Sequence, residues 1–370
     1  MTKRKKPTLV IVDGSIAVTG ALVAAGRQAE LLRDEIDTLL ILPRGHEVPA
    51  ARTETFIAVI ELPIVPLRKS AASLLLYLPA LLVASLMLRR EMKRRRCERL
   101  QLNDFYLLHG AVLRLLGFRG RIVTFVRIDP RRFGIAGRLW LAAARWCSTE
   151  IVAVSKFIQN LLLPDIPSRL IYGHNTIGEA TIERRGGTSP LFLFVGNTIE
   201  GKGQEHAVAA FNLIADRFPT ARLRFVGGDM GLAKNRLFRA RLEQAAASGP
   251  APGRIEFRGH TDDLTGDYAD AFAALNFSAS ESFSNTCFDA SSAGLPVIAT
   301  RCGGPEEIID DGDTGFLVPL GDVAAMAERM AWLLDHPAEA RAFGETGQML
   351  VGERFSPARS APEFKALFGL

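Results

Sequence analysis

Short apolar runs alternate with helical patterns along nearly the whole 370-residue chain. Each run is long enough for one buried strand, and each helical pattern can cross over to the next strand, so the alternation predicts parallel βα units. The runs fall into two sets, at 9–13, 38–42, 56–62, 99–103, 121–127, 150–154 and 169–172, and at 191–195, 223–226, 254–258, 274–278, 296–300 and 316–318.

A stretch rich in Gly, Thr and charge, residues 174–190, separates the two sets and is a plausible linker. The chain is long enough for two domains with separate cores. We therefore predict an α/β protein of two Rossmann-like, doubly wound domains facing across a cleft. The first occupies 1–174, the second 175–353, and a tail follows at 354–370.

The charge of the chain is divided unevenly between these halves. Residues 1–174 hold 27 Lys and Arg against 14 Asp and Glu, a net +13, whereas the remainder holds 18 against 26, a net −8. A basic half predicts an anionic neighbour, either a phospholipid surface or nucleic acid. Nucleic acid is the weaker candidate, because the main basic cluster lacks interleaved aromatic residues and no nucleic-acid-binding motif accompanies it.

Cysteine usage and the first residues indicate the compartment. Cys97, Cys147, Cys287 and Cys302 form no CxxC pair and have no metal-ligand spacing with histidine. A reduced, cytoplasmic setting without a metal site is therefore expected. The basic start is followed by a strand-like run and not by a signal-peptide pattern.

Residues 70–88 are nineteen residues without a charge, preceded by Arg68 and Lys69 and followed by the basic segment 89–96. Their length qualifies them as a membrane-span candidate. Pro79, the basic flanks and the position between two strands of the first domain argue against spanning. We expect an amphipathic or partly buried helix whose basic end meets anionic lipid. A buried crossover helix with a solvated basic end remains the alternative.

Two segments of the second half carry the chemistry. In residues 281–317, Glu281 lies in a loop, Asp289 follows in a helix of small residues, and a Gly-Gly pair comes after the next strand. Upstream, a strand ends at Gly196 and Lys202 opens a helix. A helix N-terminus with a lysine beside it suits a diphosphate, and carboxylates suit sugar hydroxyls, because each accepts two hydrogen bonds. A solvated surface lysine is the plain alternative for Lys202.

The spacing of these segments resembles that of the retaining GT-B glycosyltransferases of glycosyltransferase family four. Gly196 to Lys202 has the six-residue offset of the family's Gly-Arg-x4-Lys-Gly pattern, and Glu281 follows several βα units later. The resemblance implies that Lys202 neutralises the leaving diphosphate, that Glu281 orients the transferred sugar, and that Asp289 grips the nucleotide ribose. It also implies that the C-terminal tail crosses back onto the first domain and that no metal or other cofactor is needed.

Two residues depart from the family pattern. Asn197 stands where the family has arginine and supplies no charge to the diphosphate. Asp289 stands where the family has glutamate, so its carboxylate is one methylene shorter. A position near the N-terminus of its helix, favoured by the helix dipole, is the other explanation for Asp289. The resemblance further suggests Arg127, at a strand end of the first half, as a residue that stabilises the leaving phosphate; a salt bridge with Asp129 is the alternative.

The remaining site candidates follow from the same resemblance. The backbone amides of the loop after Glu281 are expected to face the sugar and diphosphate, strand-end positions line the nucleotide side, and the first glycine-rich loop faces the phosphates. These positions are Phe283, Ser284, Asn285 and Thr286, then Gly228 and His260, and finally Gly20.

The resemblance thus implies a retaining, metal-independent glycosyltransferase that uses a nucleotide-diphosphate sugar. Its expected acceptor is a lipid-linked or cell-envelope glycan, such as a polysaccharide or lipopolysaccharide precursor. The expected location is cytoplasmic and peripheral on the inner face of the cell membrane. Two alternatives stay open: a catalytically weak or inactive GT-B subunit that scaffolds a partner, suggested by Asn197 and Asp289, and a GT-B sugar-nucleotide epimerase.

Overall fold

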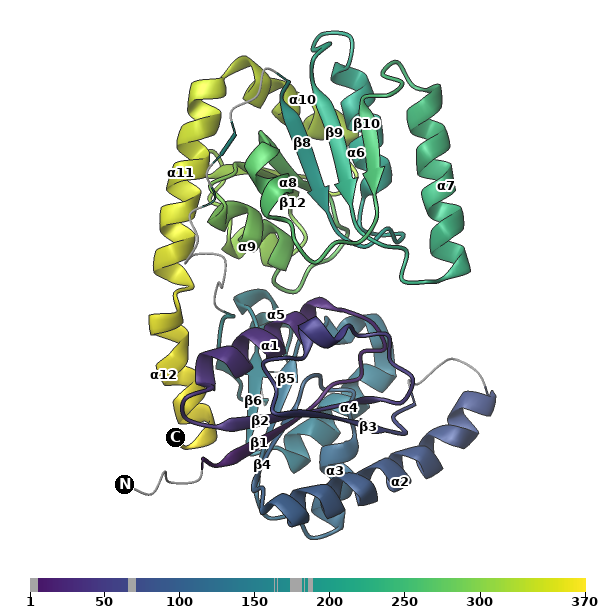
Figure 1. Cartoon of the computed structure of the whole chain (residues 1–370), viewed down its shortest axis with the longest axis vertical. Coiled ribbons are helices and arrows are strands. Elements are labelled where there is room, and N and C mark those ends of the chain that lie inside the picture. The colour runs from purple at the N-terminus through teal and green to yellow at the C-terminus, as the bar shows by residue number, and fades with distance from the viewer. Residues whose placement is uncertain are drawn as a thin grey trace. The chain divides into compact units, whose positions relative to one another are not determined.

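The computed structural model describes residues 6–65, 71–162, 164, 166–173, 182, 184–185 and 189–370, with only the backbone described for 71–75. The chain forms two compact units (Figure 1). Unit 1 comprises Met1–His174 with Pro357–Leu370, and unit 2 comprises Asn175–Ser356.

Unit 1 is built on a seven-stranded parallel sheet in the order β3-β2-β1-β4-β5-β6-β7. Because β1 is central, the chain moves outward first to one side and then to the other, as in a doubly wound fold. The strands are β1 (Thr8–Val12), β2 (Asp37–Pro43), β3 (Ala58–Leu62), β4 (Arg99–Leu102), β5 (Arg121–Val126), β6 (Glu150–Ala153) and β7 (Arg169–Leu170).

Helices cover both faces of this sheet. They are α1 (Gly20–Leu32), α2 (Ala71–Arg95), α3 (His109–Leu115), α4 (Gly134–Cys147), α5 (Lys156–Leu161) and α12 (Pro357–Phe368), with short 3₁₀ turns at Ala50–Arg52 and Pro130–Phe133. Helices α2, α3 and α4 lie side by side on one face, while α1 lies on the other and packs against α12 (Figure 1). The first layer buries residues of α2 such as Leu81, Leu88 and Met92 against β1, β2 and β4.

Unit 2 repeats the plan with a six-stranded parallel sheet in the order β10-β9-β8-β11-β12-β13. The strands are β8 (Leu191–Val195), β9 (Arg222–Val226), β10 (Ile255–Arg258), β11 (Ala273–Asn276), β12 (Val297–Thr300) and β13 (Gly315–Val318). The helices are α6 (Gln204–Ile214), α7 (Ala233–Ser248), α8 (Thr265–Asp270), α9 (Asn285–Ser292), α10 (Val323–Asp335) and α11 (Pro337–Arg354), with a 3₁₀ turn at Gly304–Glu307.

The predicted α/β class is confirmed. All thirteen predicted strands are present, each with bounds within two residues of the prediction, and every described strand pairing is parallel. Both sheets place the carboxyl ends of neighbouring strands along one edge, where ligands bind in open α/β sheets.

Residues 71–88 of the uncharged segment form the first part of α2, which continues through its basic end to Arg95 and contains Pro79. Arg68, Lys69 and Ser70 lie outside the described residues. Among the described helices, α2 included, we find none with the length and apolar character needed to cross a bilayer. The helix packs beside β3, as expected for a crossover between two strands.

The C-terminal helix α12 belongs to unit 1. Phe364 stacks on Phe125 of β5, with ring centroids 6.4 Å apart. The guanidinium of Arg99 donates to the Phe368 carbonyl at 2.7 Å. Thus the last helix completes the layer that contains α1, although 182 residues of unit 2, 175–356, separate it in sequence from the rest of unit 1.

Most of the predicted linker lies outside the described residues, but Arg184 and Arg185 are anchored to unit 2. Arg184 donates to the carbonyls of Ala271 and Phe272 at 3.0 and 3.1 Å. Arg185 pairs with Asp270 at 3.3 Å. The end of the linker is therefore held against α8 and the strand that follows it.

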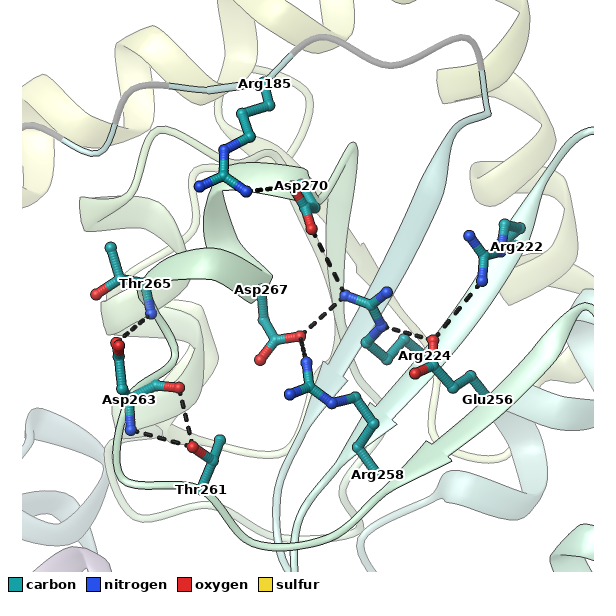
Figure 2. Close-up of polar contacts among 10 residues, drawn as sticks. All are labelled: Arg185, Arg222, Arg224, Glu256, Arg258, Thr261, Asp263, Thr265, Asp267 and Asp270. Carbon is teal, nitrogen blue, oxygen red and sulfur yellow. Dashed lines mark hydrogen bonds and ion pairs between the residues drawn. The ribbon is translucent and has the colours of Figure 1, made fainter.

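A charge network continues from this anchor across β9 and β10 (Figure 2). The buried carboxylate of Asp267 accepts from Arg224 at 2.9 Å and from Arg258 at 2.5 Å. Arg224 also donates to Glu256 at 2.8 Å. These ion pairs connect the six-residue helix α8 to the neighbouring strands β9 and β10.

Removing the charge of Asp267 tests this attachment. Asp267→Asn leaves Arg224 with a weakened partner in a site where the Arg224 side chain is 13% exposed. We expect a loss of about 3 kcal/mol in the free energy of unfolding of unit 2. The matched control is Glu200→Gln, which breaks the exposed 2.6 Å pair with Arg241 and is expected to cost less than about 1 kcal/mol. Equal losses in urea titrations of the two variants would contradict this view of the network.

Candidate active site

An ion pair between Lys202 and Glu281 marks the carboxyl edge of the sheet in unit 2. The Nζ atom of Lys202 lies 2.6 Å from Oε1 of Glu281, and the same oxygen accepts from the hydroxyl of Ser278 at 2.7 Å. Both charged side chains are partly buried, at 32% and 14% exposure. The two residues that the sequence predicted for this edge are therefore in direct contact, although 79 positions separate them.

The position of Lys202 depends on the glycine that follows it. Gly203 is the N-cap of α6 and has φ 83°, in the left-handed region. A Cβ at this position would stand 2.1 Å from the carbonyl oxygen of Phe277. Only glycine allows the start of α6 to approach the end of β11 so closely. The first N–H groups of α6 and the Lys202 ammonium consequently lie at the same edge of the sheet.

Gly196 lies in a second close backbone contact. A Cβ on Gly227 would stand 1.9 Å from the Gly196 carbonyl oxygen, so the ends of β8 and β9 touch through glycine. After Gly196, the backbone carbonyl of Asn197 accepts from the Gln204 side chain at 2.9 Å. Asn197 is half-buried, and the loop between β8 and α6 is thereby fixed to the first turn of α6.

The loop that carries Glu281 is held by backbone contacts on both sides. Glu281 N–H donates to the Cys302 carbonyl at 3.3 Å, and Gly304 N–H donates to the Glu281 carbonyl at 2.8 Å. A Cβ on Gly304 would lie 2.4 Å from Cα of Phe283. The predicted Gly-Gly pair thus fixes the acid loop against the turn after β12. Phe283 itself is buried against Phe288 and Phe355.

The residues after Phe283 form the N-terminus of α9. Ser284 caps the helix, with its hydroxyl accepting from Cys287 N–H, and has φ 70°, which is rare for a residue with a side chain. The Asn276 amide donates to the hydroxyls of Ser284 and Thr286 at 2.9 and 2.8 Å. Asn285 begins α9 beside them. This fixed turn places the N-terminus of α9 on the same edge of the sheet as Lys202 and Glu281.

Asp289 is the fifth residue of α9 and is half-buried. Because it lies beyond the first turn, which contains no acid, a favourable interaction with the helix dipole does not explain it. The alternative explanation of Asp289 is therefore wrong.

Gly228 and His260 follow β9 and β10. The Gly228 carbonyl accepts from Thr198 N–H at 2.8 Å. A Cβ on Gly228 would lie 3.3 Å from Cβ of His260. The imidazole lies 3.4 Å from Asp262 and is 47% exposed, so it sits at the outer end of this edge.

Gly20 and Arg127 are at the carboxyl edge of the sheet in unit 1. Gly20 is the first residue of α1. Arg127 follows β5, and its Nε donates to Asn103 Oδ1 at 2.9 Å. The Asn103 side chain donates in turn to the carboxylate of Asp13, which follows β1. The Arg127 guanidinium stacks over the ring of Phe125, 4.6 Å from its centroid.

The expected alternative partner of Arg127 was wrong. Asp129 binds Arg131 through side chain and backbone, at 2.9 Å in each case, because the turn at Pro130–Phe133 brings the two together. The acid facing Arg127 is Asp104, whose Oδ1 accepts from the backbone N–H of Arg127 at 3.2 Å. Burial lowers the pKa of Arg127 to about 10, while the charges of Asp104 and Asp13 oppose that shift.

The thiols near Glu281 are in the protonated form. Burial raises the pKa of Cys302 to about 11 and also raises the pKa of Cys287. Neither therefore supplies a thiolate at neutral pH. Within the described part of the chain, no group of three or more His, Cys, Asp or Glu side chains is placed to hold a metal ion.

The sequence reasoning missed Ser278 and Asn276, which hold Glu281 and the start of α9. Both side chains are buried, at 1% and 4% exposure. A signal was available: each is a polar residue inside the apolar run at 274–278, and buried polar side chains require partners.

Comparison with known proteins finds similarity mainly in the second half of the chain. Residues 189–336 match the family model described as glycosyl transferases group 1. The chain is 30% identical over 167 residues to a putative glycosyltransferase, EpsD, of Bacillus subtilis, which covers 45% of this chain and 42% of the relative. It is 28% identical over 179 residues to the GDP-mannose-dependent alpha-(1-6)-phosphatidylinositol monomannoside mannosyltransferase of Mycolicibacterium smegmatis, with 45% and 44% covered.

The chain thus spans less than half the length of these two curated relatives. Among solved structures, Anabaena Alr3699/HepE in complex with UDP-glucose superposes with a TM-score of 0.82 at 18% identity, covering 98% of this chain and 100% of that one. This likeness confirms the predicted GT-B fold.

Substitution of Gly203 tests the close approach of α6 to β11. Gly203→Ala adds a methyl group that clashes with the Phe277 carbonyl, and Gly201→Ala is the matched control, because its φ of 88° carries the same backbone strain with open space around the Cβ. We expect the free energy of unfolding of unit 2 to fall by about 1–3 kcal/mol more in Gly203→Ala than in the control. Equal losses in denaturant titrations would show that the contact is not tight.

The pH dependence of stability tests the cluster around Asp104. Burial raises the pKa of this carboxyl from 3.8 to about 7, so between those values the folded chain holds a proton that the unfolded chain has lost. Stability therefore falls as pH rises through this window. Asp104→Asn cannot titrate, and its amide oxygen can still accept from Arg127 N–H.

We expect wild type to lose a few kcal/mol relative to Asp104→Asn between pH 4.5 and 8, at about 1.4 kcal/mol per pKa unit. His109, whose pKa burial lowers to about 4, is present in both chains and cancels in the difference. The exposed Asp34→Asn is the control. A pH-independent difference between wild type and Asp104→Asn in urea titrations would refute the assignment.

Proposed function

We propose that this chain, whose residues 189–336 belong to the glycosyl transferases group 1 family, transfers a sugar from a nucleotide-diphosphate donor with retention of configuration. The observation that carries the proposal is the contact of Lys202 with Glu281 beside two helix N-termini. A cation, a carboxylate and two helix N-termini at one sheet edge match a diphosphate linked to a polyhydroxyl ring.

In this proposal the donor diphosphate lies at the start of α6, where Lys202 and the first N–H groups neutralise its charge. The sugar hydroxyls bind Glu281, which Ser278 holds in place at 2.7 Å. As the sugar–phosphate bond breaks, negative charge grows on the leaving diphosphate, and Lys202 lies where it can stabilise that charge. The positive groups at this edge belong to the chain itself, so the proposed mechanism needs neither a metal nor a covalent nucleophile.

The other residues have supporting roles in the proposal. The start of α9, from Phe283 through Ser284 and Asn285 to Thr286, presents amides to the sugar and diphosphate. Asp289 binds the ribose hydroxyls. Gly196, Asn197, Gly228 and His260 line the nucleotide side, and Gly20 is the contribution expected from the first domain.

The contacts of Arg127 give less direct support for a role at the leaving phosphate. Its guanidinium is engaged with Asn103 and stacks on Phe125, contacts that favour holding the carboxyl edge of unit 1 in shape. Its action on the leaving phosphate stays a prediction.

The proposed acceptor is a lipid-linked or cell-envelope glycan. The basic first half supports an anionic neighbour, and the mycolicibacterial relative is named for a phosphatidylinositol-linked acceptor. We propose a peripheral location on the inner face of the cell membrane, with the basic end of α2 at anionic lipid.

A second candidate is a catalytically weak subunit that scaffolds a partner. Compared with the family pattern, Asn197 supplies no positive charge to the diphosphate, and the Asp289 side chain is one methylene shorter than glutamate. Both differences would weaken donor binding in a transferase. A third candidate is an epimerase that acts on the same donor. Such an enzyme would not need a basic surface that contacts lipid. Loss of sugar transfer in Glu281→Gln, with donor binding retained, would exclude the scaffold.

The role of Lys202 is tested by Lys202→Met. If the ammonium binds the diphosphate, donor affinity should fall by a factor of about 10 to 100, the value of a hydrogen bond to a charged group. Lys234→Met is the matched control, because Lys234 is an exposed lysine near the start of α7 in the same unit. Equal donor affinities of the two variants by calorimetry would overturn the placement of the diphosphate at α6.

A further inference from the structure

Helix α4 carries an apolar stripe on the side that faces away from its sheet. Gly137, Leu141, Ala144 and Cys147 form its buried face. On the opposite face, Ile135, Leu139 and Trp146 are 78%, 65% and 58% exposed, at the i, i+4 and i+11 positions of one stripe. A helix of a water-soluble surface normally carries polar residues on this side. The stripe therefore indicates a partner.

Arginines flank the stripe. Arg138 and Arg145 lie along one edge of it, and Arg131 and Arg132 precede the helix. Beside its first turn, Arg131, Ile135, Arg138 and Leu161 line an open depression of about 470 Å³. The combination of aliphatic floor and guanidinium rim suits an amphipathic molecule with a negatively charged head.

Helix α2 repeats the arrangement in the same layer. Its buried face includes Leu81, Ala84 and Leu88, and its outward face includes Leu76, Val83 and Leu86, all exposed. The same outward stripe continues into Arg90 and Arg94 at the end of the helix. Because α3 packs between α2 and α4, the three helices form one layer on the sheet (Figure 1). The stripes of α2 and α4 lie opposite their buried faces, so both lie on the outer side of this layer.

The net charge of the layer formed by α2, α3 and α4 indicates an anionic partner. Residues 76–149 contain 15 Lys and Arg against 4 Asp and Glu, and of the four acids Asp104 and Asp129 are buried. Glu91 is paired with Arg94 and Arg95. Exposed aliphatic side chains, a tryptophan and unbalanced arginines on one surface are the composition of a helix that lies in the headgroup region of an anionic bilayer.

We infer that α4, together with α2, docks this face of unit 1 on an anionic lipid bilayer, with Leu139 and Trp146 entering the headgroup region. The inference deepens the membrane contact proposed above, which rested on α2, and adds a helix that the sequence had not marked. It rests on the proposed membrane partner and is independent of sugar transfer.

A vesicle-binding experiment with a matched pair of variants tests the inference. Leu139→Asp places a charge on the α4 stripe, and Leu237→Asp makes the same change on α7 of unit 2, where the leucine is 68% exposed. We expect partition onto phosphatidylglycerol-containing vesicles to fall about fivefold or more in Leu139→Asp and to stay at the wild-type value in Leu237→Asp. Pure phosphatidylcholine vesicles should bind all three chains weakly.

Tryptophan fluorescence supplies a second readout. Trp140 packs among Phe105, Tyr106 and Phe133, and Trp332 stacks on Phe343 in unit 2, so only Trp146 should enter the lipid. Brominated lipid should quench wild-type fluorescence and leave Trp146→Phe largely unquenched. Quenching that persists in Trp146→Phe, or equal partition of the two aspartate variants, would overturn the inference.

Two further outcomes are decided by the same samples. If Leu139→Asp converts a dimer into a monomer in size-exclusion chromatography and leaves vesicle binding unchanged, the stripe is an interface between copies and the inference is wrong. Nucleotide-sugar binding is measured alongside. If Leu139→Asp loses vesicle binding and keeps donor binding, the lipid contact is supported. If the wild-type chain binds vesicles but no donor, only the proposed transferase function is contradicted.

Discussion

The contact of Gly203 with the Phe277 carbonyl is the constraint on which the candidate site depends. It brings the start of α6 against the end of β11, so that Lys202 meets Glu281 at 2.6 Å. The same edge receives the loop of Glu281 through Gly304 and the start of α9 through Asn276. The charges of Lys202 and Glu281 and the N-termini of α6 and α9, which come from the loops after β8 and β11, are thereby collected at one edge of the sheet.

Backbone-to-backbone packing has a consequence for electrostatics. With no side chains between the loops, Lys202 and Glu281 are half-shielded from water, and their attraction is stronger than that of an exposed pair. A bound diphosphate would compete with Glu281 for the ammonium. The ion pair therefore keeps the lysine in position while the site is empty, and its rearrangement accompanies donor binding in the proposed function.

Much of this could be predicted from the sequence, for physical reasons. A buried parallel strand needs a short apolar run, so the runs located every strand in the part of the chain that the structure describes. The resemblance to the family pattern also singled out Lys202 and Glu281, which lie in the loops after β8 and β11. Their mutual contact could not be predicted, because it spans 79 positions and is decided by how two loops pack. The partner of Arg127 was misjudged for the same reason: Asp129 is nearer in sequence, but a 3₁₀ turn gives it to Arg131. The outward stripe of α4 escaped notice because its apolar residues look like core until burial is known.

The central claim is that the edge formed by Lys202 and Glu281 binds a nucleotide-diphosphate sugar. Isothermal calorimetry of the wild-type chain with uridine, guanosine and adenosine diphosphate sugars tests it most directly. The account predicts that at least one of these donors binds with a dissociation constant below about 1 mM, and that the matching free nucleoside diphosphate competes with it. Absence of binding by all three classes at millimolar concentration would contradict it.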